Sequence, residues 1–428
     1  MLIRAGRVID PLSGFDQIAD VLIKNGKIVK IAKKIEGDFD QVIDAKGLVV
    51  SPGLIDMHVH FRQPGMTHKE TIESGSMAAA RGGFTSVIAM ANTKPVIDNP
   101  HTLKEVLLIM QKQDIKVYSA AAISKNFGGK ELTDMKTLKE MGAKVFTDDG
   151  VGLDNQDFIK KAMKKAKELD LVLSFHEEDK SFIKNPGFNK GKIAESLGID
   201  GAPNVSEDVM VARDGALALH YGTKIDIQHI SSANSVELVR AYKKMGANIF
   251  AEATPHHFSL TEEAIIEHKA LAKMNPPLRT EKDRLAIIRG LQDDTIEVIA
   301  TDHAPHTDEE KNIKDIRKAP SGIIGLETAL SLAITNLVRP GYLTLKEVIK
   351  KMSYNPARLI GLEGGILQEG YPADLVIFDE DRLVKYSKFK SKSSNSPFKD
   401  KLLFGLVLYT LVDGKIIYRN EDYYEEEK

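Results

Sequence analysis

Apolar and polar residues alternate in short runs at both ends of the chain, as they do in strands that bury one face. Residues 1–50 contain such runs at 2–9, 21–23, 27–31 and 42–44, and Asn25-Gly26 is a strong signal for a hairpin turn. Residues 366–428 have the same character, with runs at 373–378, 406–412 and 415–418. Because neither end has enough strands for a stable sheet alone, we predict that the two ends pair into one small β domain.

The region between them, residues 51–365, alternates between strand-like and helix-like patterns. Eight strand candidates follow one another: Leu54 to His60, Thr85 to Ala91, Lys116 to Ala122, Lys144 to Asp148, Leu171 to His176, Lys224 to His229, Asn248 to Thr254 and Ile296 to Asp302. Helical patterns lie between them, among them Leu103 to Gln113, Gln156 to Leu169, Glu207 to Tyr221 and Ser235 to Met245. This alternation predicts an α/β fold, and eight strands favour a closed (β/α)8 TIM barrel over an open sheet.

Two segments do not fit this alternation. The stretch from His257 to Thr295 is long, so we expect it to hold a loop or extra helices before the eighth strand. The stretch from Tyr386 to Asp400 is rich in Lys and Ser, which is typical of a mobile, solvated connection.

Composition narrows the classes of function. The chain has 428 residues and a net charge of -2, with 59 basic and 61 acidic residues, so it lacks the basic patch of a nucleic-acid-binding or membrane-surface protein. A small-molecule partner fits better. There is no cysteine, so a transition metal would need His, Asp, Glu or a modified Lys as ligands. The N-terminus has no apolar signal segment and the longest apolar run, 402–412, is too short to span a bilayer, so we expect a cytoplasmic protein.

Polar residues end most of the predicted barrel strands. His58 and His60 point to the same face of the first strand, about 6.6 Å apart at about 3.3 Å per residue, so they can share one metal ion. Asp148-Asp149, His176, His229 and Asp302 end the fourth, fifth, sixth and eighth strands. Because the carboxyl ends of barrel strands converge on the active site, these side chains predict a site for one or two zinc-like ions.

Four further residues are suited to binding a substrate. Asn92 and Asn275 carry amides that can both donate and accept, which suits a cyclic amide. Arg62 directly follows the first barrel strand and can hold a carboxylate through two hydrogen bonds, and His306 could assist it. For His256 and His257, after the seventh strand, we favour a structural role or one in support of the metal ligands.

Several motifs together resemble dihydroorotases and, more broadly, the cyclic amidohydrolases. They are Asp56-Met57-His58-Val59-His60-Phe61-Arg62 with Pro64-Gly65, Phe146-Thr147-Asp148-Asp149-Gly150, Thr254-Pro255-His256-His257, Asn275-Pro276-Pro277-Leu278-Arg279, Ala300-Thr301-Asp302-His303-Ala304-Pro305-His306 and Asn395-Ser396-Pro397-Phe398. The resemblance covers nearly the whole chain and includes the two ends, which form a small β-sandwich in that superfamily.

The resemblance implies roles for the strand-end residues. His58, His60, His176 and His229 would be metal ligands, and Asp302 would be both a ligand and the catalytic acid and base. Many relatives bridge two metals with a carboxylated lysine on the fourth strand, whereas one bacterial subgroup uses an aspartate in a Thr-Asp-Asp-Gly-like stretch. We assign the bridging role to Asp149, with Lys144 as the competing candidate.

The predicted activity is the reversible, zinc-dependent cyclisation of N-carbamoyl-L-aspartate to (S)-dihydroorotate in pyrimidine synthesis. The nearest alternative is an allantoinase or hydantoinase, whose substrates would not need Arg62. An alternative of another class is an inactive barrel that serves as a structural partner of aspartate transcarbamoylase. We also expect a homo-oligomer, a dimer, and leave open a complex with aspartate transcarbamoylase, the number of metal ions and the preferred direction of the reaction.

Overall fold

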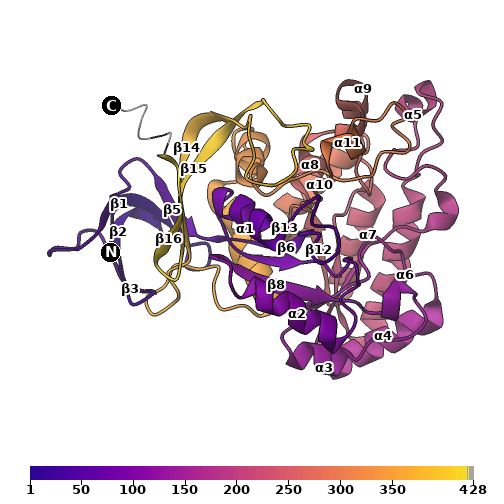
Figure 1. Cartoon of the computed structure of the whole chain (residues 1–428), viewed down its shortest axis with the longest axis horizontal. Helices are drawn as coiled ribbons and strands as arrows, with labels where there is room; N and C mark the ends of the chain where they lie inside the picture. The colour runs from indigo at the N-terminus through magenta and orange to yellow at the C-terminus, as the bar shows by residue number, and fades with distance from the viewer. Residues whose placement is uncertain (422, 424–428) are drawn as a thin grey trace.

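The chain folds into two separate sheets, each of eight strands. The structure is a computed structural model that describes residues 1–421 and 423. The sheet built from the chain ends lies at the left of Figure 1, and the sheet surrounded by helices lies at the right.

Both ends of the chain contribute to the first sheet, as predicted. Its order is β16-β15-β14-β5-β1-β2-β3, with β4 also paired to β1. The bounds are β1 Leu2–Ile9, β2 Asp16–Lys24, β3 Lys27–Ala32, β4 Val42–Asp44, β5 Val49–Pro52, β14 Leu375–Lys385, β15 Leu402–Val412 and β16 Lys415–Arg419. The two ends join where β5 pairs antiparallel with β14, with Ser51 opposite Val376.

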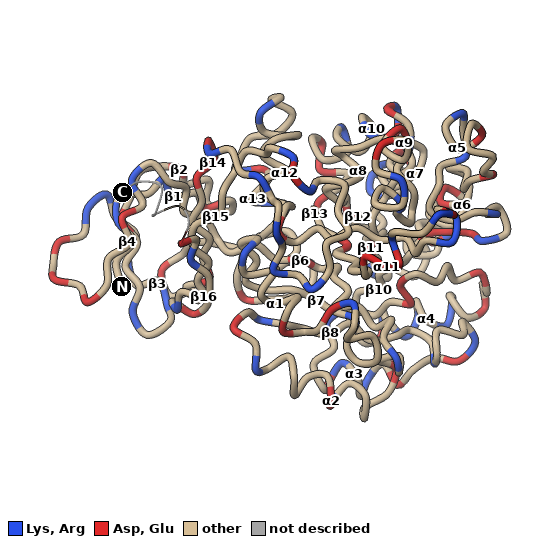
Figure 2. The backbone as a smooth tube through the Cα atoms, turned by 45° about the horizontal axis from the view of Figure 1, so that its top comes forward, with Lys and Arg blue, Asp and Glu red and all other residues tan. Residues whose placement is uncertain are grey.

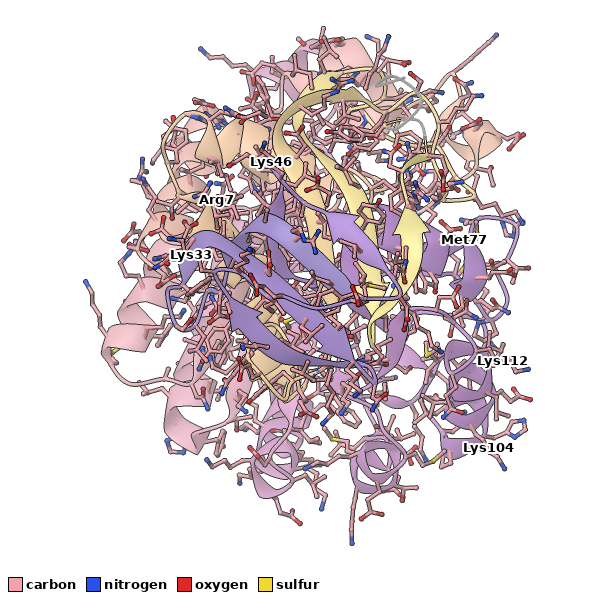
Figure 3. The ribbon with its side chains drawn as sticks, turned by 90° about the vertical axis from the view of Figure 1, so that its left-hand side faces the viewer. Arg7, Lys33, Lys46, Met77, Lys104 and Lys112 are labelled. Carbon is pink, nitrogen blue, oxygen red and sulfur yellow. The ribbon has the colours of Figure 1, made fainter. Side chains whose placement is uncertain are left out.

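This sheet curls around a core of its own. Strands from both halves of the sheet bury apolar side chains in one cluster, among them Val8, Val21, Leu375 and Leu408. The two hairpin turns meet at Ala373, whose amide donates to the Gly26 carbonyl at 2.8 Å and whose carbonyl accepts from the Gly414 amide at 3.0 Å. Figure 3 looks onto this sheet from outside the barrel. The predicted pairing of both chain ends into one small β domain is confirmed, and its strands form a single sheet.

The second sheet consists of eight parallel strands in sequence order, from β6 to β13. Their bounds are β6 Leu54–Val59, β7 Phe84–Ala89, β8 Lys116–Ala121, β9 Val145–Phe146, β10 Val172–Phe175, β11 Lys224–Ile227, β12 Ile249–Ala253 and β13 Val298–Ile299. A parallel bridge between Val59 and His303 joins the first strand to the chain that follows the last one. The TIM-barrel prediction is therefore confirmed.

Helices cover the outside of the barrel (Figure 1). They are α1 Ile72–Arg81, α2 Pro100–Met110, α3 Met135–Glu140, α4 Gln156–Glu168, α5 Lys192–Ser196, α6 Val205–Tyr221, α7 Ala233–Lys244, α8 Pro255–Ser259, α9 Ala264–His268, α10 Glu281–Gln292, α11 Asp308–Lys311, α12 Ala329–Ala333, α13 Leu345–Ile349 and α14 Asn355–Ile360. Short 3-10 helices are η1 Lys125–Phe127, η2 Lys180–Phe182 and η3 Lys269–Ala272, and π-helical segments are η4 Ile334–Val338 and η5 Lys350–Tyr354. The long stretch before the eighth strand does hold extra helices, α8, α9 and α10.

Local sequence explains where several helices begin. Thr71 caps α1 and exchanges hydrogen bonds with Ser74, and Asn99 caps α2 just before Pro100. Thr280 and Asp283 form the same reciprocal pair at the start of α10. Each cap satisfies amides that the first helical turn leaves without partners.

The prediction of a mobile, solvated connection from Tyr386 to Asp400 is wrong. Asn395 and Ser396 are 0% and 1% exposed, and Tyr386 and Phe398 are 3% exposed each. The Asn395 amide donates to the carbonyls of Ala304 and Gly322 at 3.0 Å each. Asn395 therefore satisfies buried backbone groups instead of facing water, whereas Lys388, Lys390 and Lys392 of the same segment are exposed.

Charged residues of both signs are interspersed over the whole described chain (Figure 2). Within that part of the chain, no helix is both long and apolar enough to cross a bilayer. The boundaries near residues 50 and 365 between the two domains remain a prediction.

Candidate active site

Six predicted ligands gather at the carboxyl end of the barrel. His58 lies at the end of β6, His60 just beyond it, and His176 directly after β10. Asp149, His229 and Asp302 follow β9, β11 and β13 by two or three residues. All six are at most 6% exposed. The barrel therefore brings together residues that are far apart in the sequence.

The backbone is strained where some of these residues leave the strands. His229 has a φ of 35°, Asp302 a φ of 47° and Arg62 a φ of 58°. Such left-handed conformations are uncommon for residues other than glycine and persist where the surrounding structure enforces them. They turn the side chains away from the direction that a regular strand would give.

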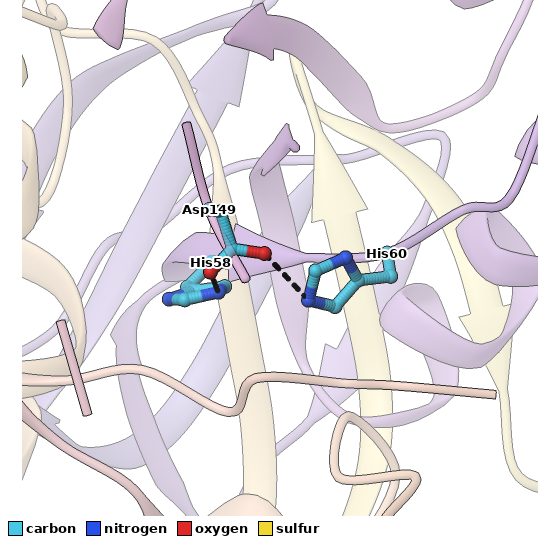
Figure 4. Close-up of side chains that lie close together, drawn as sticks. All are labelled: His58, His60 and Asp149. Carbon is cyan, nitrogen blue, oxygen red and sulfur yellow. Dashed lines mark ion pairs between the residues drawn. The ribbon is translucent and has the colours of Figure 1, made fainter. Parts of the chain in front are cut away.

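The ring nitrogens and carboxylate oxygens converge on one small volume (Figure 4). Asp149 Oδ1 lies 3.3 Å from His58 Nε2, and Asp149 Oδ2 lies 3.5 Å from His60 Nε2. The same carboxylate lies 3.9 Å from His176 Nδ1 and 3.8 Å from His229 Nε2. Asp149 thus lies between two pairs of histidines.

Three groups of three residues present ligand atoms within 4.8 Å of one another: His58, His60 and Asp149; Asp149, His176 and His229; His58, His229 and Asp302. Asp302 Oδ1 is 2.9 Å from His60 Nε2 and 3.6 Å from His58 Nε2. Imidazole and carboxylate ligands in this number are compatible with a metal site.

The environment of His58 provides a test of this fit. Its Nδ1 lies 3.1 Å from the Glu252 carboxylate, so Nδ1 carries the proton and donates it. Its Nε2 is buried, has no hydrogen-bond partner and faces Asp149 and Asp302. A buried nitrogen lone pair that is directed at two carboxylates suits a cation between them, and a carboxylate behind the ring is typical of metal-binding histidines.

Two other histidines are oriented in the same way. His60 Nδ1 lies 2.9 Å from Asn92 Oδ1, and His176 Nε2 lies 3.1 Å from the Glu178 carboxylate. In each ring the outer nitrogen donates to an oxygen, which leaves the inner nitrogen as a lone pair toward the cluster.

The negative carboxylates and the positive histidines of the cluster stabilise one another's charges. Burial alone would raise the pKa of the Asp149 and Asp302 carboxyls, but His58 and the other histidines hold both pKa values below the ordinary range. Burial opposes a charge on His58, yet the carboxylates of Asp302 and Asp149 raise the pKa of its imidazole well above the usual value, so a proton occupies Nε2 wherever a metal ion does not take its place. Both carboxylates therefore stay ionised and favour positive charge at this position.

The other residues named from the fourth strand lie elsewhere. Lys144 precedes β9, at the opposite end of the strand from Asp149, and its ammonium lies 5.4 Å from the centre of the Tyr118 ring. Asp148 accepts hydrogen bonds from the amides of Ile123 and Ser124 at 2.8 and 3.0 Å. Of these three candidates, Asp149 alone joins the cluster.

A cavity of about 210 Å³ opens above the cluster. Its walls include five of the six predicted ligands and all four residues predicted to bind substrate: His60, Asp149, His176, His229, Asp302, Arg62, Asn92, Asn275 and His306. His58 lies behind this wall and is 0% exposed. The cavity is of a size suited to a small molecule.

The Arg62 guanidinium is held without a charged partner. Its Nε donates to the Pro305 carbonyl at 3.2 Å, and no ion pair joins it to a carboxylate of the described residues. Burial lowers the pKa of Arg62, but a guanidinium stays charged in proteins. The cavity wall therefore presents a cation.

His306 is neutral beside this cation. Burial, followed by the nearby charge of Arg62, lowers the pKa of its imidazole to about 2. Its Nε2 donates to the Ser321 carbonyl at 2.9 Å, and its Nδ1 lies 3.3 Å from the Lys69 ammonium, which donates to it. These two contacts assign the proton to Nε2, whereas the longer contacts of Nε2 with Arg62 Nη2 and of Nδ1 with Glu310 Oε2, both at 3.4 Å, suit the other tautomer.

Asn92 and Asn275 differ in the groups they leave for a ligand. Both ends of the Asn92 amide are hydrogen-bonded within the protein. Its Oδ1 accepts from His60, and its Nδ2 donates to Asp149 Oδ2 at 2.9 Å. Asn275 Nδ2 donates to Glu178, and its buried Oδ1 has no partner. Asn275 therefore presents a free acceptor.

Sequence reasoning missed the two carboxylates behind the rings. Glu252 lies within β12, where it looks like any buried strand residue, and β12 is not a neighbour of β6 in the sheet. Glu178 follows His176 by two residues, which was the available signal. The structural role favoured for His257 agrees with its contacts, Thr254 Oγ1 at 2.7 Å and the Pro276 carbonyl at 3.0 Å.

Comparison with known proteins identifies the family of the chain. Residues 47–235 match the model of a dihydro-orotase-like family, and residues 320–418 match an amidohydrolase family model. A dihydroorotase of Clostridioides difficile (strain 630) is 56% identical over 98% of this chain and 99% of its own length. The chain belongs to the dihydroorotase family. A dihydroorotase of Lactococcus lactis subsp. lactis (strain IL1403) is 51% identical over 98% of this chain and 99% of its own length.

Solved structures confirm the fold of this dihydroorotase family member. An L-hydantoinase (dihydropyrimidinase) from Arthrobacter aurescens superposes with a TM-score of 0.87 at 24% identity, covering 98% of this chain and 96% of that chain. A dihydropyrimidinase from Brevibacillus agri NCHU1002 gives a TM-score of 0.84 at 24% identity, covering 98% and 95%. The predicted family resemblance and the cyclic amidohydrolase class are confirmed.

Proposed function

We propose that this protein interconverts N-carbamoyl-L-aspartate and (S)-dihydroorotate, with zinc at the His/Asp cluster. The observation that carries the proposal is the Arg62 guanidinium, which lies without a carboxylate partner in the wall of the same cavity as the cluster. A substrate that brings its own carboxylate supplies the missing partner, and both forms of this substrate do so. Hydantoin and allantoin carry no carboxylate and would leave the guanidinium unpaired.

The proposed ligands form two sets that share Asp149. One set contains His58 and His60, and the other contains His176 and His229. Asp302 lies near the first set. This sharing supports two zinc ions, one of which would be held by each set, with Asp149 contributing to both.

The proposed chemistry divides between zinc and the protein. When bound, zinc lowers the pKa of water and stabilises negative charge on an amide oxygen. Asp302 stays ionised beside His60 and His58, so it can accept a proton from the attacking water and return it to the departing ring nitrogen. Arg62 binds the substrate carboxylate, and Asn275 and His306 hold the ring, so their contribution is mainly positioning.

An assay of the purified protein with dihydroorotate, hydantoin and allantoin tests this proposal. We expect turnover of dihydroorotate, its loss after prolonged chelation and its return when zinc is added. Metal analysis of the same samples gives the number of ions per chain. Full activity in verified metal-free protein, or turnover of hydantoin without dihydroorotate, would refute the proposal. A cytoplasmic location, a homodimer and a complex with aspartate transcarbamoylase stay predictions.

A further inference from the structure

Glu178 is a buried carboxylate at the edge of the cavity. It lies in the loop after β10, two residues beyond His176, and is 3% exposed. One of its oxygens, Oε2, accepts two hydrogen bonds, while Oε1 has no hydrogen-bond partner. Because burial of a carboxylate is costly, the two bonds to Oε2 and the nearby charge of Arg279 together offset it.

The first bond fixes the tautomer of His176. Its Nε2 lies 3.1 Å from Glu178 Oε2, and an ionised carboxylate can only accept, so Nε2 carries the proton. In the neutral ring the other nitrogen, Nδ1, carries the lone pair, and it lies 2.9 Å from His229 Nε2. Glu178 thus directs the His176 lone pair into the cluster.

The second bond fixes the orientation of an amide on a distant segment. Asn275 Nδ2 donates to the same Oε2 atom. Because an ionised carboxylate can only accept, the amide must turn its NH2 group toward it. The Asn275 Oδ1 is then turned away from Glu178, and it is buried without a partner in a residue that lines the cavity. Asn275 therefore offers an acceptor, which fits an N–H of a cyclic amide or of a ureido group.

We propose that Glu178 is a positioning residue that couples the metal cluster to substrate recognition. One carboxylate oxygen orients both the lone pair of His176 and the acceptor of Asn275. Among the described residues, no hydrogen bond joins the His176 and Asn275 side chains directly. The substrate half of this proposal rests on the proposed dihydroorotase activity. The metal half does not.

Four variants test the effect of Glu178 on zinc binding separately from its effect on substrate binding. They are Glu178→Ala, Glu178→Gln, Asn275→Ala and the double variant Glu178→Ala/Asn275→Ala. Zinc affinity is measured by competition with a chelator. The kcat and KM for dihydroorotate are measured with zinc in saturating excess, so that lost metal does not appear as a lowered kcat. Thermal unfolding of each variant shows whether it is folded. Glu262→Ala is the matched control, since Glu262 accepts from the Asn189 amide at 2.6 Å outside the cavity wall.

Glu178→Ala should weaken zinc binding roughly 10- to 100-fold, as expected for loss of a partner behind a ligating histidine. It should also raise the KM for dihydroorotate by roughly 3- to 10-fold, the range of one hydrogen bond. Asn275→Ala should raise KM by a similar factor and leave zinc affinity unchanged. Glu178→Gln retains an acceptor oxygen but loses the charge, so its zinc affinity should lie between those of the parent and Glu178→Ala.

The double variant decides whether the two effects are coupled. Because Glu178 acts on substrate only through Asn275, adding Glu178→Ala to Asn275→Ala should lower zinc affinity without a further rise in KM. A folded Glu178→Ala protein with the zinc affinity of the parent would overturn the proposal, and so would a KM effect of full size in the Asn275→Ala background. If the parent does not turn over dihydroorotate, the proposed function fails, and the zinc affinities of the same proteins still decide the role of Glu178.

Discussion

Replacement of Arg62 by alanine tests substrate recognition most directly. The guanidinium lies in the cavity wall and is held by the Pro305 carbonyl, and it takes no part in the metal cluster. Arg62 has a φ of 58°, a conformation that costs an alanine about as much as an arginine, so the change does not add backbone strain. The variant therefore removes the cation and little else.

The expected loss follows from the burial of this charge. If Arg62 pairs with the substrate carboxylate in a partly desolvated site, truncation leaves that carboxylate unpaired and should cost about 2 to 5 kcal/mol. At about 1.36 kcal/mol per factor of ten, this is roughly a 30-fold to several-thousand-fold loss in kcat/KM. Arg62→Lys should recover only part of it, because an ammonium cannot form the paired hydrogen bonds of a guanidinium.

The assay is hydrolysis of dihydroorotate, measured together with zinc content. Arg4→Ala, which removes an exposed arginine from the small sheet, serves as the control and should leave kcat/KM unchanged. Zinc content should be the same in all variants, since Arg62 is not a proposed ligand. An unchanged rate in Arg62→Ala, or a loss that merely follows lost zinc, would remove Arg62 from substrate binding and favour a substrate without a carboxylate.

Three further predictions concern the ligands and the loops around them. Asp149→Ala should lower zinc content and activity far more than Lys144→Ala, and the reverse ranking would indicate a modified lysine as the bridge. Asn395→Ala leaves the His306 amide and two buried carbonyls without partners, so urea titration should show a loss of about 2 to 4 kcal/mol, whereas an unchanged midpoint would contradict the buried role of this residue. Burial lowers the pKa of Lys311 from 10.5 to about 7, so between these pH values the unfolded chain binds more protons and the free energy of unfolding should rise with pH. Lys311→Met should flatten this rise, and an equal slope in the variant would show that Lys311 stays protonated.

The sequence was sufficient to locate the cluster because the rule behind it is topological. Parallel strands that alternate with helices place all their carboxyl ends on one face, so a polar residue at each strand end lies near the others. His58, His176 and His229 could be grouped in this way without knowledge of any distance. Helix and strand positions were also predictable, although β9 and β13 are shorter than their apolar runs suggest.

Contacts across the barrel could not be predicted in the same way. Glu252 reaches His58 from a strand that is not its neighbour, and nothing in the local pattern of β12 marks one side chain as the partner of a particular ring. The segment from Tyr386 to Asp400 failed for a related reason. Its Ser and Asn residues resemble those of a solvated loop, because composition does not show whether a polar side chain bonds to water or to a buried carbonyl.

Barrel closure and site assembly depend on the same few residues. The amide of His60 donates to the His303 carbonyl at 2.8 Å, next to the bridge between Val59 and His303 that joins the two ends of the sheet. His60 is a proposed ligand, and Asp302 directly precedes His303, so closure brings Asp302 Oδ1 to 2.9 Å from His60 Nε2. An open sheet would keep the ligands of β9, β10 and β11 together but would separate His60 from Asp302. Asp302, the proposed acid and base, therefore meets the proposed ligand His60 only in the closed barrel, which explains why a complete barrel is needed to position them.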